Sequence, residues 1–479
     1  MQFLDSGIHG DLTYSDVFLV PSLSDVTSRY EADLGPGDGT GMTIPLIASN
    51  MNAVTGPRLA ATIARRGGIG VLPQDMGPAD LLGAIRWVKE QSPLWDSPYR
   101  ASADTTVAEA LTRLPATRGF AFIVTEGDED LGVVPAELLA TVDRHSTLGQ
   151  LSQSGWLALE AETITDGEQA YEALAATNHA FALVVRRGHI IGTISDKTAV
   201  RSTVYTPNLN AQGTLGLAAA VGINGDVTGR AKALVEAGVD VLVLDTAHGH
   251  QRAMVQAVEA VAALDLGVPI VAGNVVTAQA TNDLVQAGAN IVKVGVGPGA
   301  MCTTRMMTAV GRPQFSAVLE AAEAARVAGA HVWADGGVQF PRDVALALAA
   351  GARGVMIGSW FAGNIESPGQ IQREANGDLF KTNWGMASTK AVTERFARLS
   401  AFERARKAMF SEGISESRVK LDPERPSIED SIDAITAGVR SSMTYAGARD
   451  IEAFHERAVV GVQSAAGYEE GRARERISR

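Results

Sequence analysis

The second half of the chain repeats one pattern, in which a short apolar run ends in a polar residue or a glycine and an alanine-rich, helix-like stretch follows. The runs are largely β-branched and lack the polar alternation of half-exposed strands, which is typical of parallel strands buried on both faces. Five such units in succession predict a (β/α)8 barrel of the α/β class, with its site at the carboxyl ends of the strands. A doubly wound open sheet remains the alternative. The five runs are 241–244, 269–272, 290–294, 331–334 and 354–357.

The same pattern occurs near the start of the chain, where two apolar runs at 45–51 and 68–72 precede helix-like stretches. Between 93 and 205 the pattern differs. Two segments, 107–134 and 167–194, each contain a helical stretch, an apolar strand, a turn and a second strand. Such self-similarity indicates an internal duplication. Because a unit inserted into a surface loop costs little free energy, we predict that this duplicated module interrupts the barrel.

These patterns divide the chain into three parts. Residues 1–92 are predicted to form the first part of the barrel, residues 93–205 the inserted module, and residues 206–479 the second part of the barrel. Within the last part, residues 385–440 are polar and show no strand pattern. A long irregular segment beside a functional face predicts a mobile flap.

Composition excludes several classes of function. The formal net charge is −13 and the pI is about 5.2, so the chain lacks the basic surface that nucleic acid or an anionic membrane requires. No stretch approaches the roughly 18 apolar residues of a membrane helix. A single cysteine cannot form an internal disulfide, and the N-terminus shows no secretory signal. Together these features predict a cytoplasmic protein.

The only cysteine, Cys302, lies in a glycine-rich loop that runs from Gly295 to Arg305. Glycines allow turns that are closed to other residues and bring backbone N–H groups close to a ligand. Those N–H groups and Arg305 would favour the thiolate, which is the nucleophilic form of cysteine. The loop therefore predicts covalent catalysis by Cys302. The alternative is a buried cysteine that acts as a small apolar residue, the usual fate of a free thiol.

Two other strand ends carry residues suited to a nucleotide. Asp335 precedes Gly336-Gly337, and a carboxylate beside glycines can accept hydrogen bonds from the two hydroxyls of a ribose. Gly358-Ser359 opens a helix-like stretch and offers N–H groups and a hydroxyl to a phosphate. Each could be an ordinary tight turn, but with the cysteine loop they indicate a nucleoside monophosphate as the ligand.

These motifs, together with Gly385-Met386 and residues 440–445, resemble those of the IMP dehydrogenase/GMP reductase family. The resemblance extends in order over nearly the whole chain, and the cysteine loop is its most specific part. It implies a TIM barrel, and the duplicated module resembles the family's tandem CBS (Bateman) module, for which ATP or GTP are the expected effectors. It also implies a homotetramer or homo-octamer that acts on GMP or IMP, with neither nucleic acid nor membrane as partner.

The resemblance implies a role for each matching residue. Cys302 corresponds to the thiolate that attacks C2 of the purine, and Thr304 and Glu412 correspond to a proton relay. The implied cofactor is NADPH, or NAD in the alternative reaction, and a monovalent cation such as K+ is allowed without assigned ligands. The residues implied to bind the nucleotide are Ser49, Met51, Gly299, Asp335, Gly337, Gly358, Ser359, Gly385 and Met386, and those implied to contact the cofactor are Asp245, Asn274, Ser441 and Tyr445, the last two across a subunit boundary.

The family contains two activities, and the resemblance favours the GMP reductase branch. IMP dehydrogenases carry an Arg-Tyr pair on the flap that activates water, whereas residues 385–440 contain no tyrosine and only Arg398-Leu399 approximates the pair. The resemblance therefore implies NADPH-dependent reductive deamination of GMP to IMP and ammonia, in purine salvage and interconversion. Oxidation of IMP to XMP with NAD stays an alternative, because residues 245–250 resemble the dehydrogenase pattern.

Some positions depart from the family's pattern. Ala300 and Asn383-Trp384 stand where a serine and a tyrosine usually bind the phosphate, and these losses leave a non-catalytic purine-nucleotide sensor as a further alternative. In the second half of the module Ser195 is kept, but Thr198 replaces an aspartate that usually holds a ribose. We therefore expect altered effector binding at that position.

Overall fold

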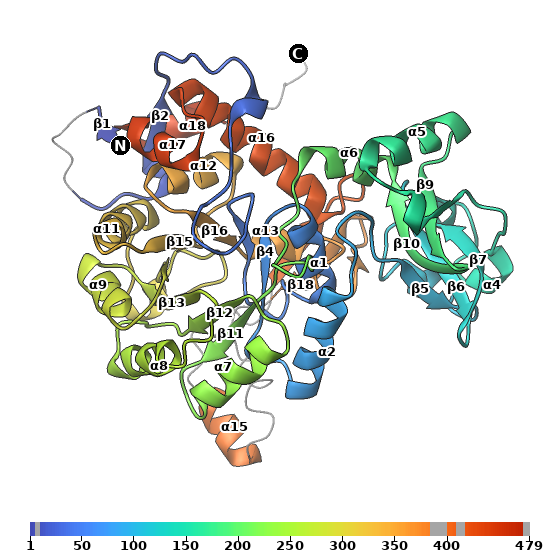
Figure 1. Ribbon diagram of the computed structural model, residues 1–479, viewed down its shortest axis with the longest axis horizontal. Helices are drawn as coiled ribbons and strands as arrows, with labels where there is room; N and C mark the ends of the chain where they lie inside the picture. Colours follow the sequence, from blue (N-terminus) through green and yellow to red (C-terminus); the bar gives the residue numbers. More distant parts are fainter. Residues whose placement is uncertain (5–9, 384–399, 409–416, 473–479) are drawn as a thin grey trace.

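Eight parallel strands close into a barrel in the computed structural model, which describes residues 1–4, 10–383, 400–408 and 417–472 (Figure 1). The strand order is β11-β12-β13-β14-β15-β16-β3-β4, and β4 pairs with β11 to complete the ring. This confirms the predicted barrel, and the open sheet is wrong. The strands are β3 (Leu46–Ala48), β4 (Ile69–Leu72), β11 (Ala218–Gly222), β12 (Val241–Asp245), β13 (Ile270–Val275), β14 (Ile291–Val294), β15 (His331–Asp335) and β16 (Gly354–Ile357).

All of these strands except β11 coincide with predicted apolar runs. The sequence of β11, Ala-Ala-Ala-Val-Gly, is rich in alanine, which favours helices. Tertiary packing overrides that preference, because Ala218 and Ala219 are fully buried between β4 and β12. The alanine-rich sequence has a low strand propensity, and β11 was therefore not predicted from the sequence.

Side chains fill the barrel interior, and helices cover its outside. Trp333 and Met356 are fully buried in one interior cluster with residues from the other strands, so the barrel is a packed core and not a channel. A ligand therefore cannot bind inside the barrel. The surrounding helices are α1 (Pro57–Arg65), α2 (Pro78–Lys89), α7 (Val227–Glu236), α8 (Arg252–Ala262), α9 (Ala278–Gln286), α11 (Gln314–Val327) and α12 (Pro341–Ala349), with the short α10 (Thr304–Thr308) and α13 (Ser359–Ala362) at the mouth.

The inserted segment forms a lobe beside the barrel, on the right in Figure 1, and consists of two units of the same construction. In each unit a parallel strand pair is extended by an antiparallel hairpin. The sequence predicts both hairpins but not the first strand of either unit. The first unit contains β5 (Tyr99–Ser102), α3 (Val107–Ala110), β6 (Ala121–Glu126), β7 (Glu129–Pro135) and α4 (Leu148–Leu151), and the second β8 (Ala158–Glu160), α5 (Gly167–Thr177), β9 (Phe181–Arg186), β10 (His189–Ser195) and α6 (Asp196–Val204).

A small antiparallel sheet of β17 (Gln372–Arg373), β18 (Leu379–Asn383) and β19 (Ser417–Leu421) lies outside the barrel strands. The sequence predicts no strand in residues 385–440, yet β19 and the first part of helix α16 (Ile428–Ala446) lie there. The strand was missed because Ser-Arg-Val-Lys-Leu places charged residues on its exposed face. Ser427 caps the amino end of α16 through the Glu429 N–H group. The described part of this segment also contains α15 (Ala401–Ala408).

The two ends of the described chain meet. A sheet of β1 (Gln2–Phe3), β20 (Val459–Val462) and β2 (Val17–Val20) joins them, followed by α18 (Ala465–Glu470). Helix α17 (Ile451–Arg457) packs on α12 beside this sheet. In the portion of the chain that the structure describes, no helix is both long and apolar enough to span a membrane.

Candidate active site

Three charged side chains meet at the carboxyl ends of the barrel strands. Asp245 ends β12, Asp335 ends β15, and Lys293 lies in β14 between them. The Lys293 Nζ atom lies 2.7 Å from an oxygen of Asp245 and 2.7 Å from an oxygen of Asp335. One cation therefore joins the carboxylate predicted to bind the ribose to the carboxylate predicted to lie at the cofactor site.

Lys293 is 2% exposed. Burial alone would lower its pKa, but the adjacent carboxylates of Asp245 and Asp335 outweigh burial and raise the pKa above the ordinary lysine value. The lysine is therefore a permanent cation at neutral pH, and it lies between the two carboxylates. Sequence reasoning missed this residue, although a lysine inside the apolar run Ile-Val-Lys-Val is a visible signal.

Two asparagines complete this charged cluster. The Asn50 amide donates to the second oxygen of Asp245 at 2.9 Å, and the Asn274 amide donates to Asp335 at 2.9 Å and to the Gly295 carbonyl at 2.7 Å. The Asn274 Oδ1 atom is buried and has no hydrogen-bond partner among the described residues. Because a buried unpaired acceptor costs about 1–3 kcal/mol, this oxygen is suited to a donor on a ligand. Asn50, like Lys293, was not predicted.

The Gly336-Gly337 turn after Asp335 packs against the cysteine loop. Gly337 has a φ of +82°, and a Cβ atom there would lie 3.3 Å from Pro298 and 3.5 Å from both Gln314 and Tyr14. A side chain would be strained by this backbone conformation and crowded by these neighbours. The Gln314 amide donates to the Asp335 carbonyl at 3.2 Å, at the start of the turn, and to the Val294 carbonyl at 2.8 Å. The turn therefore holds Asp335 and the loop that contains Gly299 together.

Ser49, Met51 and Gly358 lie together on the next side of the mouth. Ser49 and Met51 follow β3, and a Cβ atom on Gly358 would lie 3.1 Å from Met51 Sδ and 3.2 Å from Ser49 Oγ. The Ser49 hydroxyl is buried, and no hydrogen-bond partner for it lies in the part of the chain that the structure describes. Ser359 is the first residue of α13. The structure therefore places these four predicted nucleotide-binding residues side by side.

Cys302 is exposed, which argues against the buried apolar role. Its thiol donates to the Thr304 hydroxyl at 3.2 Å, and its backbone N–H donates to the Gly299 carbonyl at 3.0 Å. Thr304 begins α10, so this short helix presents its hydroxyl beside the sulfur. The aliphatic part of Arg305 lies against Gly297, and no polar contact joins Arg305 to Cys302 among the described residues. The predicted Cys–Thr pair is thus formed, whereas the predicted help from Arg305 has no contact to support it.

Three predicted site residues, Gly385, Met386 and Glu412, lie outside the described residues, as does Arg398. Asn383 at the end of β18 and Ser417 at the start of β19 border the undescribed segments, and the Ser417 hydroxyl donates to Met301 Sδ at 3.0 Å. Met301 directly precedes Cys302. The sheet that contains β18 and β19 therefore reaches the cysteine loop itself.

Comparisons with known proteins agree with this geometry. Residues 11–474 match the family described as IMP dehydrogenase / GMP reductase domain. The chain belongs to this family. It is 51% identical over 474 residues to the GMP reductases of Mycobacterium tuberculosis and Mycobacterium bovis, covering 98% of each chain, and 35% identical over 452 residues to the inosine-5'-monophosphate dehydrogenase of Halalkalibacterium halodurans, covering 93% of this chain and 92% of the relative. A crystal structure of a GMP reductase variant from Trypanosoma brucei in complex with guanosine 5'-monophosphate superposes with a TM-score of 0.69 at 31% identity, covering 98% of this chain and 99% of that one.

Two residues that the family resemblance assigns to the cofactor lie away from the charged cluster. Ser441 and Tyr445 are on α16, where the Ser441 hydroxyl donates to the Ala437 carbonyl within the same helix. The Tyr445 side chain is 61% exposed. Within the described chain neither contacts Cys302 or the charged cluster, so one subunit alone does not bring them to the site.

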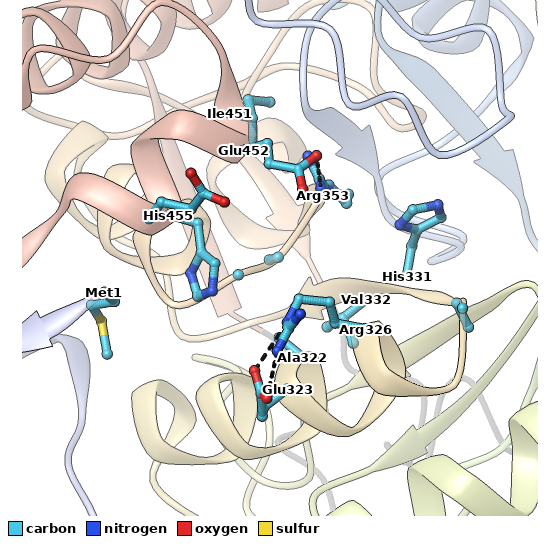
Figure 2. Close-up of a pocket in the computed structure, with 15 residues that line it drawn as sticks. Met1, Ala322, Glu323, Arg326, His331, Val332, Arg353, Ile451, Glu452 and His455 are labelled. Carbon is cyan, nitrogen blue, oxygen red and sulfur yellow. Dashed lines mark hydrogen bonds and ion pairs between the residues drawn. The ribbon is translucent and has the colours of Figure 1, made fainter.

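A cavity of about 560 Å³ lies at the opposite end of the barrel from the family's site residues (Figure 2). His331, the first residue of β15, lines it together with two ion pairs, Arg326–Glu323 and Arg353–Glu452. Both arginines are thus already neutralised. None of the described residues that the sequence predicts for catalysis or binding lines this cavity.

Proposed function

We propose that this chain is a GMP reductase, which converts GMP to IMP and ammonia in purine salvage and interconversion. The observation that carries the proposal is an exposed Cys302 thiol, paired with the Thr304 hydroxyl at 3.2 Å, beside a strand-end cluster built around Asp335. Identity of 51% with proteins named GMP reductase, against 35% with one named IMP dehydrogenase, supports this branch of the family.

The proposed reaction takes place at C2 of the purine. The Cys302 thiolate adds to C2, the bond from C2 to the exocyclic nitrogen breaks, and that nitrogen leaves as ammonia after it accepts a proton. A hydride then adds to C2, the C2–Sγ bond breaks, and IMP leaves with the thiolate restored. Overall GMP, NADPH and two protons give IMP, NADP+ and an ammonium ion. We assign proton movement to Thr304 with Glu412, and ribose binding to Asp335.

The hydride requires a nicotinamide cofactor, for which NADPH is our proposal. Asn274 Oδ1 is buried and finds no partner within the described ranges, and Asn274 lies beside the Asp335–Lys293–Asp245 cluster. Such an oxygen fits the N–H donors of a carboxamide. Bound NADPH would supply the hydride, while Asn274 and Asp245 orient its nicotinamide end. The contributions of Ser441 and Tyr445 are assigned to a neighbouring subunit of a homotetramer or homo-octamer, and a K+ ion remains an additional proposal.

IMP dehydrogenase is the second candidate. It requires a group that activates water to hydrolyse the covalent intermediate, and residues 385–440 contain no tyrosine for the family's Arg-Tyr pair. The Thr304 hydroxyl is instead placed beside the sulfur, where it can serve the release of ammonia. These two facts favour the reductive direction.

For residues 93–205 we propose a tandem CBS module that binds ATP or GTP. At the second unit, the Ser195 hydroxyl caps α6, and the Thr198 hydroxyl, which is nearly fully buried, donates to Asp96 at 2.6 Å. Both hydroxyls are thus engaged in structural hydrogen bonds. We therefore propose that a ribose binds elsewhere in the module. We also propose that the protein acts in the cytoplasm.

Two assays distinguish the candidates. The protein is incubated with GMP and NADPH, and separately with IMP and NAD, while nicotinamide absorbance and ammonia are followed. A reductase consumes NADPH and releases ammonia, whereas a dehydrogenase forms NADH. Cys302→Ala should abolish both signals, and its retained turnover would exclude covalent catalysis. Nucleotide binding without turnover in either assay would instead favour the sensor.

A further inference from the structure

The β17-β18-β19 sheet is built into the hydrophobic core of the inserted module. One continuous cluster combines buried residues of the module's first unit, such as Leu114 and Phe122, with residues of the second part of the barrel. The Ile371 N–H group also donates to the Thr112 carbonyl at 2.7 Å, so backbone and side chains both cross this boundary. The barrel-side members are Ile365, Ile371, Leu379 and Leu421, each at most 7% exposed.

The other end of the same sheet touches the nucleophile loop. Leu379 pairs with Leu421 at the module end of the β18–β19 pair, and Asn383 pairs with Ser417 at the opposite end. The Ser417 hydroxyl contacts Met301 Sδ at 3.0 Å, and Met301 is 8% exposed. Four residue steps separate the two ends, which is about 14 Å of strand. Two short strands therefore connect the module's core to the residue next to Cys302.

The second unit of the module is attached differently. Its own core, which contains Ile164 and Leu174, includes no residue of the β17-β18-β19 sheet. Its last helix, α6, is held to the barrel by charge, because Arg201 pairs with Glu429 at 3.0 Å and Asp430 at 2.6 Å on α16. The described contacts of α16 do not include the cysteine loop. The second unit packs on the first through a shared cluster that includes Ile123 and Phe181. Within the described part of the chain, only the first unit packs directly against the sheet that reaches the nucleophile loop.

We infer that the first unit of the module, residues 99–151, positions the Cys302 loop through β18 and β19, and that the second unit, whose core lacks residues of this sheet, has no such direct route. Close-packed cores transmit small displacements, because a side chain cannot move without its neighbours. A change in the first unit therefore shifts Met301 and alters the access and orientation of the Cys302 thiol. A ligand of the module acts on the active site by this route when it binds the first unit.

A matched pair of variants tests the inference in the full-length protein. Leu114→Ala opens a cavity in the first unit, and Leu174→Ala opens one in the second unit; the two leucines are 0% and 1% exposed. The readout is the rate at which iodoacetamide alkylates Cys302, the only thiol in the chain. We expect about a threefold or larger change in Leu114→Ala and no change in Leu174→Ala. Equal effects in both variants, or no effect of Leu114→Ala, would overturn the inference.

A second pair of variants with smaller truncations keeps the test valid if the leucine variants fail to fold. Ile371→Val and Ile164→Val each remove one methylene from the two cores, where the isoleucines are 5% and 8% exposed. The alkylation rate should again change only in Ile371→Val. If both pairs alter the rate alike, the nucleophile responds to general destabilisation and the inference fails.

The inference rests on the proposed function only for its link to turnover, since alkylation requires no substrate. A protein without GMP reductase activity, in which Leu114→Ala alone changes alkylation, would refute the function and keep the inference. The opposite result is GMP reductase activity together with the same Cys302 alkylation rate in Leu114→Ala and in wild type. This result would keep the function and refute the inference.

Discussion

Replacement of Lys293 by methionine should make the stability of the protein depend strongly on pH. In the wild-type protein Lys293 Nζ lies 2.7 Å from both Asp245 and Asp335, whose side chains are 18% and 21% exposed. Without the cation, two carboxylates face each other across about 5 Å. With an effective dielectric constant of about 20, their repulsion is about 3 kcal/mol. This value lies at the lower end of the loss of about 3–5 kcal/mol typical when one partner of a buried ion pair is removed.

The sign of the pH dependence follows from this repulsion. In Lys293→Met one carboxylate acquires a folded-state pKa above its unfolded value of about 3.9. A raised pKa adds stability below the unfolded value, and that stability is lost as the pH rises through the folded value. The deficit of Lys293→Met relative to wild type should therefore be small near pH 4 and reach about 3 kcal/mol near pH 8.

Urea denaturation at a series of pH values measures this deficit. Lys89→Met is the matched control, because Lys89 pairs at 2.5 Å with a single carboxylate, Asp240, which also accepts hydrogen bonds from Asn210 and the Leu217 N–H group. The loss of unfolding free energy in Lys89→Met relative to wild type should vary little with pH. The KM for GMP should rise about tenfold in Lys293→Met, because Asp335 loses its orientation. A deficit that is the same at pH 5 and pH 8 would refute the reasoning.

Three further predictions follow from single contacts. Thr304→Val should lower kcat about 100-fold with little change in the KM for GMP, as expected for a proton-transfer group; an unchanged kcat would remove Thr304 from the chemistry. Burial raises the pKa of Glu366 to about 7, against hydrogen bonds from Ser427 and the Ile428 N–H group, so wild type loses stability between about pH 4.5 and 7. The melting temperature of Glu366→Gln relative to wild type should therefore rise from pH 5 to pH 8, and a constant difference would contradict this. Arg201→Met should destabilise by about 3 kcal/mol in urea, because it removes one cation from three carboxylates of α16 and leaves only Arg66 beside Glu429 and Lys197 beside Asp430. Arg186→Met, whose partner Glu162 is 62% exposed, should stay within about 1 kcal/mol of wild type, and equal losses in the two variants would refute the distinction.

Much of the candidate site was predictable because it is local in the sequence. Asp245 and Asp335 each end a strand, and Asn274 is the next-to-last residue of another. The apolar run of each strand is visible in the sequence, and parallel strands bring their carboxyl ends to one mouth. Gly299, Cys302 and Thr304 lie within six residues of one another in a loop. Short-range order and strand periodicity were sufficient for these residues.

The remaining features depend on contacts between distant parts of the chain. The sequence by itself determined the alternation of strands and helices, the duplicated module and the residues at the strand ends, since periodicity and turn chemistry are local properties. Only the tertiary structure decided that Lys293 neutralises two carboxylates from different strands, and that Leu421 of β19 packs into a core with Leu114, more than 300 residues away. Closure of the barrel and docking of the module create these neighbours, and burial there makes an isolated lysine or leucine part of one interacting group.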